Sequence, residues 1–561
     1  MQALPAFASV PHEVMPGLAA APQSANDRPT CTWGVNGWTE MDWDFVIVGS
    51  GFGGSVCALR LVEKGYRVLL LEKGRRLGAN DFPHSNWNLK RWLWVPMLGF
   101  RGLFKMTFLR HATVLSGVGV GGGSLVYANT LPVPKDEFFT APSWGSLAAW
   151  KRELHPHYQT AQRMLGVVEN PQLTPPDEVL QELARDLGRE NGFERTRVAV
   201  YFGEPGRTVP DPYFGGEGPE RTGCILCGAC MIGCRHGAKN TLDKNYLWLA
   251  EKRGLRLQAD TEVSWVRPFD GEGYEVAALQ GASLLNRKRF RTTARNVIFA
   301  GGVLGTVPLL LKLKESPNGL PKLSPRLGEF VRTNSEALLG VVTRRKELDL
   351  SNGIAIGSIL HTDAHSHLEP VRYPKGSGFF RLLSAPHVTG TTIPIRVIRL
   401  IATVIRHPIN FLRAYFVRDW ARSTMILLFM RTIDSHLRLR RTRLGRLTTA
   451  LGQGPAPTSS IPEATDLAHR ISKKIDGFAG SMVTEMILGT PTTAHILGGC
   501  CMGDSPDTGV IDHQHRLFGY DGLYVVDGSA VSANPGVNPS LTITALAERA
   551  MSLIPTRAEI A

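Results

Sequence analysis

The sequence lacks long apolar runs, although 43% of its 561 residues are hydrophobic. No stretch reaches the roughly 18 consecutive apolar residues that a membrane-spanning helix needs. Residues 1–40 also lack the cationic start and continuous apolar core of a secretory signal. Their composition predicts a disordered tail. We hypothesise that this tail is not native and that Met41 is the natural start.

Cysteine is scarce, with eight in the chain, and four of the eight lie within residues 224–234. So few thiols in a chain of this length do not predict a disulfide framework. A reducing cytoplasm is therefore the expected location, and peripheral contact with a membrane is left open.

Acidic residues are outnumbered, 49 against 63 Lys and Arg, which gives a net charge of +14. Such a balance favours anionic partners such as nucleic acid, a membrane surface or an acidic substrate. It also fits a soluble enzyme from a lineage that uses arginine freely. No pattern of a nucleic-acid-binding fold accompanies the charge, so we expect no nucleic-acid partner.

Glycine, in contrast, is abundant, and its clearest pattern lies in residues 44–72. An apolar strand at 44–48 runs into Gly49-x-Gly51-x-x-Gly54, and a helix and a second strand at 67–71 follow. In this arrangement the glycines allow a tight turn and close backbone approach to a pyrophosphate. Glu72 ends the second strand, where it can accept hydrogen bonds from a ribose. The pattern predicts a dinucleotide site, without choosing between FAD and NAD.

Three later segments extend this pattern. Residues 115–134 hold a second glycine-rich loop, which suits close contact with a flat ligand. Residues 295–312 read as a strand that returns to the dinucleotide domain and then a helix. Residues 523–540 read as a strand, an Asp-Gly-Ser turn and Gly-Val-Asn-Pro before a helix, which Ser540 is expected to cap.

Taken together and in this order, these motifs resemble the glucose–methanol–choline (GMC) flavoprotein oxidoreductases, and within them the cholesterol oxidase-like branch. The resemblance covers residues 41–555 and is weakest between about 345 and 480. It implies FAD as the cofactor. The implied contacts with FAD are Gly49, Gly51, Phe52, Gly54, Glu72, Gly119, Gly122, Gly123, Ser124, Val263, Asp527, Gly528 and Asn538.

The resemblance also implies two catalytic residues. His495, in His-Ile-Leu-Gly-Gly-Cys, matches the family's catalytic histidine, and Asn538 matches its asparagine. A histidine with a pKa near neutrality can accept the hydroxyl proton as hydride leaves the carbinol carbon. Asn538 can hydrogen-bond the same oxygen and fix its position.

Two departures from the family stand out. Tyr127 occupies a position after the second glycine loop where the family often has Asn, and Asn129 lies two positions on. Cholesterol oxidases also use a glutamate to move the steroid double bond, and residues 423–434, the segment expected to correspond, contain none. On this basis, coupled isomerisation is in doubt.

The cysteine run Cys-x2-Cys-x2-Cys-x3-Cys has two interpretations. It matches the ligand spacing of bacterial ferredoxins, but Arg235 follows it instead of Pro and no second run exists. The alternative is a structural loop near the flavin domain, with no metal bound, which we favour. The cluster ligands of the first interpretation are Cys224, Cys227, Cys230 and Cys234.

Residues 85–110 and 392–422 interleave aromatic or aliphatic residues with basic ones at helical spacing. Such segments suit a membrane interface. They equally suit a lid or an oligomer contact with a solvated basic face. Residues 437–446, rich in Arg, suit contact with anionic lipid or a solvated hairpin.

We therefore predict an α/β fold, α+β overall. A discontinuous Rossmann-like FAD-binding domain is expected from 41–135, 235–345 and 485–561. A substrate-binding domain, built on a mainly antiparallel sheet and helices, is expected from 136–234 and 346–484 and includes the cysteine run.

The expected reaction, in sterol metabolism, is oxidation of a secondary alcohol, with best match to the 3β-hydroxyl of cholesterol or a related sterol. Hydride would pass to flavin N5, with molecular oxygen as the acceptor. The alternative enzyme is a dehydrogenase of another bulky or long-chain alcohol that passes electrons to a carrier, through an iron–sulfur cluster at residues 224–234. A flavin-free sterol- or membrane-binding protein is a third possibility, against which His495 and Asn538 argue.

Overall fold

The computed structural model describes residues 41–269, 272–282, 286–388, 390, 392–452 and 455–560. Residues 41–561 form one compact unit. The tail predicted at 1–40 lies outside the described residues. In the part of the chain that is described, no helix is both long and apolar enough to cross a bilayer.

A seven-stranded sheet carries the predicted dinucleotide motif. β1 and β2 run parallel because the helix between them carries the chain back to the end of the sheet at which β1 began. The order is β12-β2-β1-β15-β14-β13, and β25 also pairs with β15. The strands are β1 (Trp43–Val48), β2 (Val68–Leu71), β12 (Arg256–Gln258), β13 (Thr261–Phe269), β14 (Gly273–Gln280), β15 (Lys288–Phe299) and β25 (Leu523–Val525).

Helices cover this sheet. Helix α1 (Phe52–Glu63) packs against α12 (Ser540–Ser552) and α6 (Tyr246–Lys252), and α12 packs against α4 (Trp150–Met164). Helix α7 (Val303–Lys314) follows β15 and contacts β13. Because β1 and β2 are buried on both faces, they read as continuous apolar runs and not as alternating ones.

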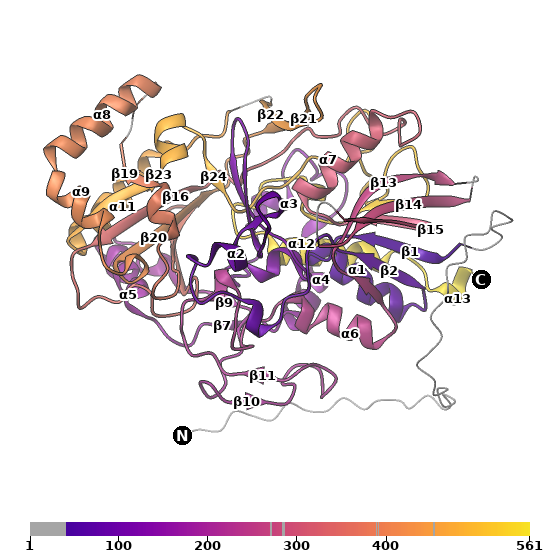
Figure 1. The fold of residues 1–561 in the computed structure, drawn as a ribbon, viewed down its shortest axis with the longest axis horizontal. Helices are drawn as coiled ribbons and strands as arrows, with labels where there is room; N and C mark the ends of the chain where they lie inside the picture. The colour runs from indigo at the N-terminus through magenta and orange to yellow at the C-terminus, as the bar shows by residue number, and fades with distance from the viewer. Residues whose placement is uncertain are drawn as a thin grey trace. The chain divides into compact units, whose positions relative to one another are not determined.

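A second seven-stranded sheet is antiparallel throughout, in the order β19-β23-β16-β20-β18-β17-β8. Figure 1 shows it on the opposite side of the 41–561 unit from the first sheet. Its strands are β8 (Phe193–Arg195), β16 (Ala337–Thr343), β17 (Ser358–His361), β18 (Ser366–Val371), β19 (Ser384–Pro386), β20 (Thr424–Arg431) and β23 (Gly477–Met482). The predicted α/β fold, with a mainly antiparallel second sheet, is confirmed.

Strand β20 shows how this sheet is placed between a core and a cavity. Met425, Leu427 and Phe429 belong to a core shared with α5 (Pro175–Asp186) and α11 (Pro462–Lys474). The alternate residues Ile426 and Leu428 line a cavity on the other face. Since side chains alternate along a strand, an unbroken apolar run here means that both faces are covered by apolar surroundings.

β1, β2, β25 and their flanking helices agree with their predicted positions to within a few residues, whereas β15 begins at Lys288, seven residues before the predicted start. β15 joins the dinucleotide sheet, as predicted, where it pairs with β1. One predicted detail is wrong: Pro539 is the N-cap of α12, and no side-chain cap hydrogen bond is present, because Ser540 is already the first helical residue. Strand β16 also belongs to the second sheet, although it lies within the predicted FAD-binding segment 235–345. The division into two domains otherwise stays a prediction.

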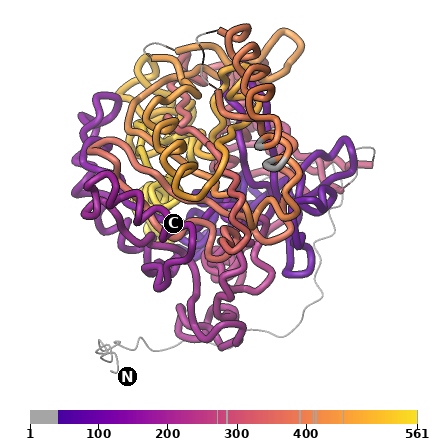
Figure 2. Tube along the Cα trace, turned by 90° about the vertical axis from the view of Figure 1, so that its left-hand side faces the viewer, coloured from indigo at the N-terminus to yellow at the C-terminus, as the bar shows by residue number. Residues whose placement is uncertain are grey.

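The helical spacing of residues 85–110 predicted a helix that the structure does not contain. Apart from the short α2 (Leu89–Trp92), this segment forms the strands β3 (Trp94–Val95), β4 (Phe100–Arg101) and β5 (Phe104–Phe108). Trp92 and Phe104 are stacked in a buried cluster, so these aromatics fill a core. The predicted helices appear only in the second segment, as α8 (Ile393–Arg406) and α9 (Pro408–Tyr415), shown in orange in Figure 2. Residues 437–446 form the start of a hairpin, β21 (Leu437–Arg441) with β22 (Leu447–Leu451).

Candidate active site

One continuous cavity of about 810 Å³ extends from the first sheet to the second. Its polar end is lined by the glycine-rich loops and by backbone that follows β1 and β15. Its apolar end is lined by the second sheet. His495 and Asn538 lie in its wall. Residues predicted from separate motifs therefore meet in a single chamber.

The first glycine-rich loop brings backbone close to backbone. A Cβ atom on Gly49, whose φ is +105°, would lie 2.5 Å from the carbonyl oxygen of Ala300. A Cβ on Gly54 would lie 2.0 Å from the carbonyl oxygen of Gly49, so Gly54 permits the approach of α1. A Cβ on Gly51 would meet nothing within 4 Å. Gly49, Gly51 and Phe52 line the cavity, and Gly54 lies behind them.

The second glycine-rich loop lies against the first. A Cβ on Gly122 would be 2.7 Å from Cα of Gly51, so the two loops touch. Gly122 and Gly123 line the cavity. Ser124 instead holds the loop, since its Oγ donates to Gly121 O at 2.7 Å and accepts from Leu242 N at 3.1 Å. Gly119, with φ of +140°, likewise shapes the loop from behind the wall.

Glu72 directly follows β2 and lines the cavity beside the first loop. Its Oε2 accepts from the N–H and Oγ of Ser50 at 3.1 and 2.7 Å, and its Oε1 accepts from Gly74 N at 2.8 Å. The carboxylate thus ties the loop to the strand end. Because each carboxylate oxygen has two lone pairs, Glu72 retains acceptor capacity for a ribose hydroxyl.

Val263, Asp527 and Gly528 also lie in the cavity wall, as predicted. Asp527 Oδ2 accepts from Gly302 N at 2.8 Å and from Thr306 Oγ1 at 2.6 Å. Burial raises the pKa of Asp527, against the effect of these hydrogen bonds. The carboxyl group fixes the Asp-Gly-Ser turn to the start of α7, at the polar end of the cavity.

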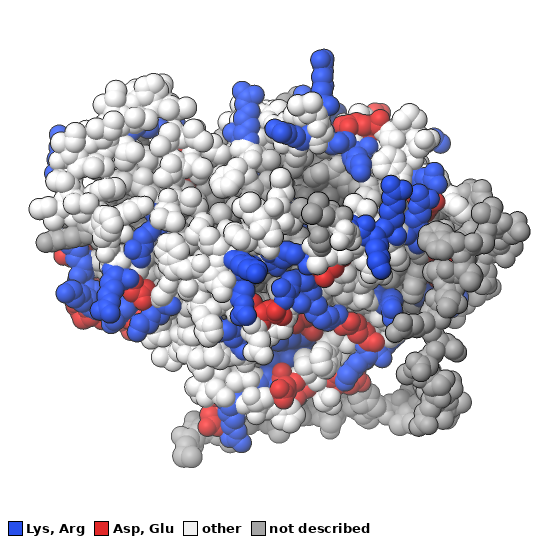
Figure 3. All heavy atoms as spheres, in the orientation of Figure 1, with Lys and Arg blue, Asp and Glu red and all other residues white. Residues whose placement is uncertain are grey.

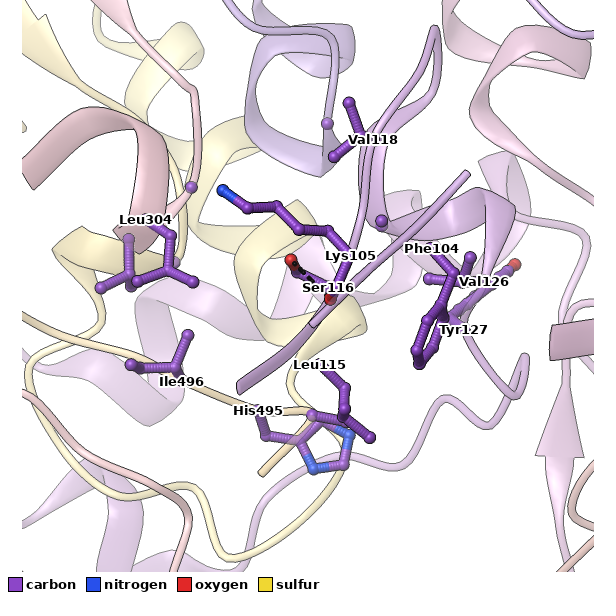
Figure 4. A pocket seen from close by; sticks show the side chains of 18 of the residues that line it. Phe104, Lys105, Leu115, Ser116, Val118, Val126, Tyr127, Leu304, His495 and Ile496 are labelled. Atoms are coloured by element: carbon purple, nitrogen blue, oxygen red, sulfur yellow. Dashed lines mark hydrogen bonds between the residues drawn. The ribbon is translucent and has the colours of Figure 1, made fainter. Parts of the chain in front are cut away.

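His495 is held by Glu336. Strand β24 (Thr492–Thr493) pairs with β6 (Thr113–Gly117) and delivers His495 to the cavity beside Leu115 (Figure 4). Nδ1 of His495 lies 2.6 Å from Oε2 of Glu336, whose other oxygen accepts from Ala494 N at 2.6 Å. Burial alone would lower the pKa of His495, but the charges of Glu336 and Glu369 more than offset it and the pKa is raised. With Nδ1–H donated to Glu336, Nε2 is the nitrogen left for a substrate.

Glu369 is a site residue that the sequence analysis missed. It is fully buried on β18, and its Oε2 accepts from Asn538 Nδ2 at 3.4 Å. Among the described residues, Oε1 of Glu369 and Oδ1 of Asn538 have no hydrogen-bond partner. Oε1 of Glu369 lies 3.5 Å from Nε2 of the buried His367. Oδ1 of Asn538, in the cavity wall, is the atom left for a bound molecule, since buried polar atoms are costly to leave unpaired.

Glu369 lies on the strand next to the segment 423–434, in which the sequence predicted a glutamate position. Residues 423–434 form β20, and Glu369 pairs directly opposite Leu428 across the β18–β20 ladder. Opposed residues of an antiparallel pair project to the same face. Glu369 therefore faces the side on which Leu428 lines the cavity. The absence of a glutamate from 423–434 does not mean that the site lacks a carboxylate.

Large apolar side chains form the rest of the wall. They come from adjacent strands of the second sheet and from the segments that flank it. The set is Leu338, Ile356, Val371, Phe380, Trp420, Ile426, Leu428 and Met482. These eight side chains are all apolar, so this surface suits an apolar body attached to a polar reacting group.

Comparison with known proteins identifies the family of this chain. Family models described as GMC oxidoreductase match residues 219–319 and 444–547, and one described as NAD(P)-binding Rossmann-like domain matches residues 47–104. A cholesterol oxidase of Acinetobacter baumannii is 44% identical over 530 residues, which cover 92% of this chain and 95% of that protein. The chain belongs to the GMC oxidoreductase family. Like other GMC enzymes, it is an FAD-dependent oxidoreductase that acts on CH–OH groups.

Other relatives agree with this placement. A cholesterol oxidase of Mycobacterium tuberculosis is 48% identical over 538 residues, covering 92% of each chain. The crystal structure of pyridoxine 4-oxidase from Mesorbium loti has a TM-score of 0.59 and 16% identity, and the match covers 91% of this chain and 98% of that one. This likeness concerns the fold alone.

The cavity fits the FAD of a GMC enzyme. The open space at Gly51, the contact between the two glycine loops and the acid at the end of β2 suit an extended dinucleotide. Unpartnered Asn538 Oδ1 lies in the wall at the other end, where the ring system would meet a substrate. The residues that would hold FAD are those predicted, with Gly54, Gly119 and Ser124 acting through the loop shape.

Lys105 is a second residue that the sequence analysis missed. It projects from β5 across the cavity toward the side of Leu304 (Figure 4). Burial and the neighbouring Lys73 lower the pKa of Lys105 to about 8. It can place a cation beside an anionic ligand. No sequence signal marked it, because isolated lysines in apolar segments are common.

Tyr127, noted as a departure from the family, lines the cavity and forms an edge contact with Phe52. Its hydroxyl donates to Asn240 O at 2.6 Å, and the ammonium of buried Lys239 lies 4.6 Å from its ring centroid. Burial lowers the pKa of Lys239 to about 7. Tyr127 thus shapes the wall through its ring, while Asn129 is fully buried.

The cysteine run forms a loop beside this wall. Gly228 N donates to Gly353 O at 2.8 Å, Lys239 Nζ donates to Cys230 O at 2.7 Å, and Met231 lines the cavity. Burial raises the pKa of the Cys224 thiol to about 12 and that of Cys230 above its ordinary value. Within the described ranges, no three side chains of His, Cys, Asp or Glu are arranged to hold a metal ion.

Proposed function

We propose that this GMC enzyme oxidises the 3β-hydroxyl of cholesterol or a related sterol, with molecular oxygen as the final electron acceptor. The observation that supports the substrate is the apolar wall of the second sheet, which faces the same cavity as His495 and Asn538. A rigid apolar ring system with one hydroxyl matches a chamber that is apolar along its length and polar at one end. The names of the relatives at 44% and 48% identity support the same substrate.

FAD, which the two glycine-rich loops and Glu72 would hold, would supply the two-electron chemistry as the hydride acceptor at N5. The chain's own residues manage the proton and the position of the oxygen. Nε2 of His495 accepts the hydroxyl proton, and Glu336 holds the ring and stabilises the positive charge that results. The Asn538 side chain hydrogen-bonds the same oxygen. The alcohol thereby becomes a ketone.

We infer a second role for Glu369. A Δ5-sterol ketone becomes conjugated when a proton moves from C4 to C6, and this transfer needs a base near the steroid A and B rings. Glu369 is the buried carboxylate beside Asn538, and its second oxygen makes no hydrogen bond among the described residues, with His367 Nε2 3.5 Å away. This geometry favours coupled isomerisation, which the sequence alone had left in doubt.

The enzyme is proposed to be cytoplasmic, which the free thiols Cys57, Cys224, Cys227, Cys230, Cys234, Cys500 and Cys501 support. Because sterols dissolve in bilayers, we also propose that it takes its substrate during peripheral contact with a membrane.

The test is an anaerobic titration of the purified flavoprotein with a 3β-hydroxysteroid, followed by admission of oxygen. Stoichiometric loss of flavin absorbance and its return with oxygen would support the proposal. A spectrum that stays unchanged with the sterol but bleaches with a long-chain alcohol would favour the alternative substrate. Slow return with oxygen, or broad iron–sulfur absorbance beneath the flavin bands, would instead favour a dehydrogenase that uses a carrier.

A further inference from the structure

A second, smaller pocket of about 250 Å³ lies between α8, α11 and the chain that follows β19. Helix α8 contributes Arg399, Ala402, Thr403 and Arg406, which recur at helical spacing on one face. The remaining lining residues are His387, Val388, Thr465 and His469. Two arginines, two histidines and two threonines line it, and no acidic residue does.

The histidines and hydroxyls give this pocket a defined polar wall. His387 is held in place, with Nε2 2.9 Å from Thr465 Oγ1 and Nδ1 3.2 Å from Ser481 Oγ. Burial and His469 lower the pKa of His387 to about 4, so it is neutral near pH 7. The positive charge therefore comes from Arg399 and Arg406. The hydroxyls of Thr403 and Thr465 donate to backbone carbonyls, at 2.8 Å to Arg399 O and 3.1 Å to Ile461 O, so the charged donors of this wall are the two guanidinium groups. Guanidinium groups are the usual partners of a phosphate group.

The adjoining face of α8 is apolar and exposed. Ile398, Ile401 and Ile405 are 65%, 54% and 74% exposed, and α8 has no buried residue. Ile409 and Leu412 on α9 are 61% and 50% exposed. In Figure 3 the surface around α8, at the upper left, is largely uncharged. A contiguous row of large apolar side chains that are exposed to water marks an interaction surface.

The sequence of this region is also one-sided in charge. Residues 387–418 contain five arginines and no Asp or Glu. An exposed apolar stripe next to a cationic face is the pattern of a helix that lies in the plane of a membrane interface. A contact between two copies of the chain would place the arginines of both copies together, which disfavours that occupant.

We propose that the pocket lined by Arg399 and Arg406 binds the phosphate of an anionic phospholipid headgroup, while the isoleucine face of α8 enters the outer acyl region. The α8–α9 pair lies in the chain between Phe380 and Trp420, two residues of the large cavity's apolar wall. Docking through these helices therefore holds the wall segments next to the bilayer. The proposal concerns lipid binding and holds whether or not a sterol is the substrate.

The test uses the full-length flavoprotein and flotation with two kinds of vesicle, phosphatidylcholine alone and phosphatidylcholine with phosphatidylglycerol. We expect tighter binding to the anionic vesicles, weakened by salt. The R399Q/R406Q pair should lower this affinity at least about tenfold. Ala402→Glu places a carboxylate in the pocket and should do the same without removing an arginine. I398E/I405E should abolish binding to both kinds of vesicle.

Two matched controls lie elsewhere on the surface. Arg189→Gln removes an exposed arginine and Leu553→Glu charges an apolar residue that is 47% exposed, and both should bind vesicles as the wild type does. Equal binding of the wild type and A402E to anionic vesicles would overturn the headgroup site. Stabilisation by inorganic phosphate without vesicle binding would identify a soluble anion and overturn the lipid source. A shift from dimer to monomer in I398E/I405E, with no vesicle binding by the wild type, would assign the face to a second copy.

Discussion

At the scale of single residues, the pairing of His495 with Glu336 decides how the histidine can act. Their 2.6 Å contact fixes one ring nitrogen and leaves the other for the substrate. Glu336 is fully buried, so water screens its interaction with the imidazole only weakly. Without Glu336, burial would lower the pKa of this histidine against the charge of Glu369 alone.

Glu336→Gln should therefore move the pH profile. The substitution removes the charge that raises the pKa of His495, so the pKa falls and the neutral, proton-accepting form persists to lower pH. We expect the acidic limb of kcat/KM against pH to shift to lower pH. The loss of kcat should be smaller than the roughly 10²–10⁴-fold that removing a general base costs. His495→Asn is the control for that larger loss, and an unmoved acidic limb in E336Q would contradict the assignment.

Glu369→Gln should separate oxidation from isomerisation. Glutamine keeps the shape and can still accept from Asn538, but it cannot carry a proton. With cholesterol as substrate, alcohol oxidation should stay within about tenfold of wild type, while formation of the conjugated ketone should slow by about 10²-fold or more. Both steps can be followed together by flavin and enone absorbance. Conjugated ketone formed at the wild-type rate would rule out Glu369 as the base.

At the scale of elements, the second sheet is tied to α5 by a buried ion pair. Arg372, which follows β18, lies 2.9 Å from Asp177 at the start of α5, and both side chains are 1% exposed. Thr174 and Ser358 complete the hydrogen bonds of Asp177. Burial would raise the pKa of Asp177, but Arg372 overrides it and the pKa is lowered. This contribution to stability is present above the ordinary range of an aspartate and is lost only in acid, as pH falls through the lowered pKa.

Arg372→Met should destabilise the protein by about 3–5 kcal/mol, because it leaves Asp177 buried without its partner. The exposed pair Arg470–Asp466 on α11 is the matched control, and Arg470→Met should cost no more than about 1 kcal/mol. Thermal or denaturant unfolding of the holoenzyme measures both. Similar losses of unfolding free energy in the two variants would show that the buried pair stabilises the fold no more than the exposed pair does.

The elements also show why the segments 85–110 and 392–422 turned out differently. Both interleave apolar and basic residues, so the pattern alone predicted the same helices for both. In the first, Trp92 and Phe104 found partners in Phe380 and Leu125 of the same core cluster, and local strands resulted. In the second, no such partners cover Ile398 and Ile405, which stay exposed. Tertiary packing therefore overrode the periodicity in one case.

At the scale of the whole molecule, residues 41–561 are compact by themselves. The start of this unit is anchored, since Asp42 Oδ2 accepts from Thr293 N and Thr292 Oγ1, both at 2.9 Å. A chain that begins at Met41 should therefore bind FAD and unfold at the same temperature as the full chain. A chain that begins at Gly49 lacks β1, a strand between β2 and β15, and should not fold. Loss of FAD binding in the Met41 chain would show that residues 1–40 contribute to the folded unit.

The sequence by itself determined the dinucleotide part of this protein. Gly49, Gly51 and Glu72 lie within 24 residues, so strand, turn and acid specify one another through local geometry. His495 and Asn538 were also predicted as site residues, but only through a resemblance that spans most of the chain. Their local sequences contain nothing that separates a catalytic histidine from a structural one.

Only the tertiary structure decided which groups complete the site. Glu336 reaches His495 across 159 residues, and Glu369 reaches Asn538 across 169 residues. These contacts depend on which strands pair and which face each strand turns to the cavity. A shift of one residue in the β18–β20 register would turn Glu369 away from it. The phosphate pocket beside α8 likewise exists because α8 and α11, far apart in sequence, lie side by side in the fold.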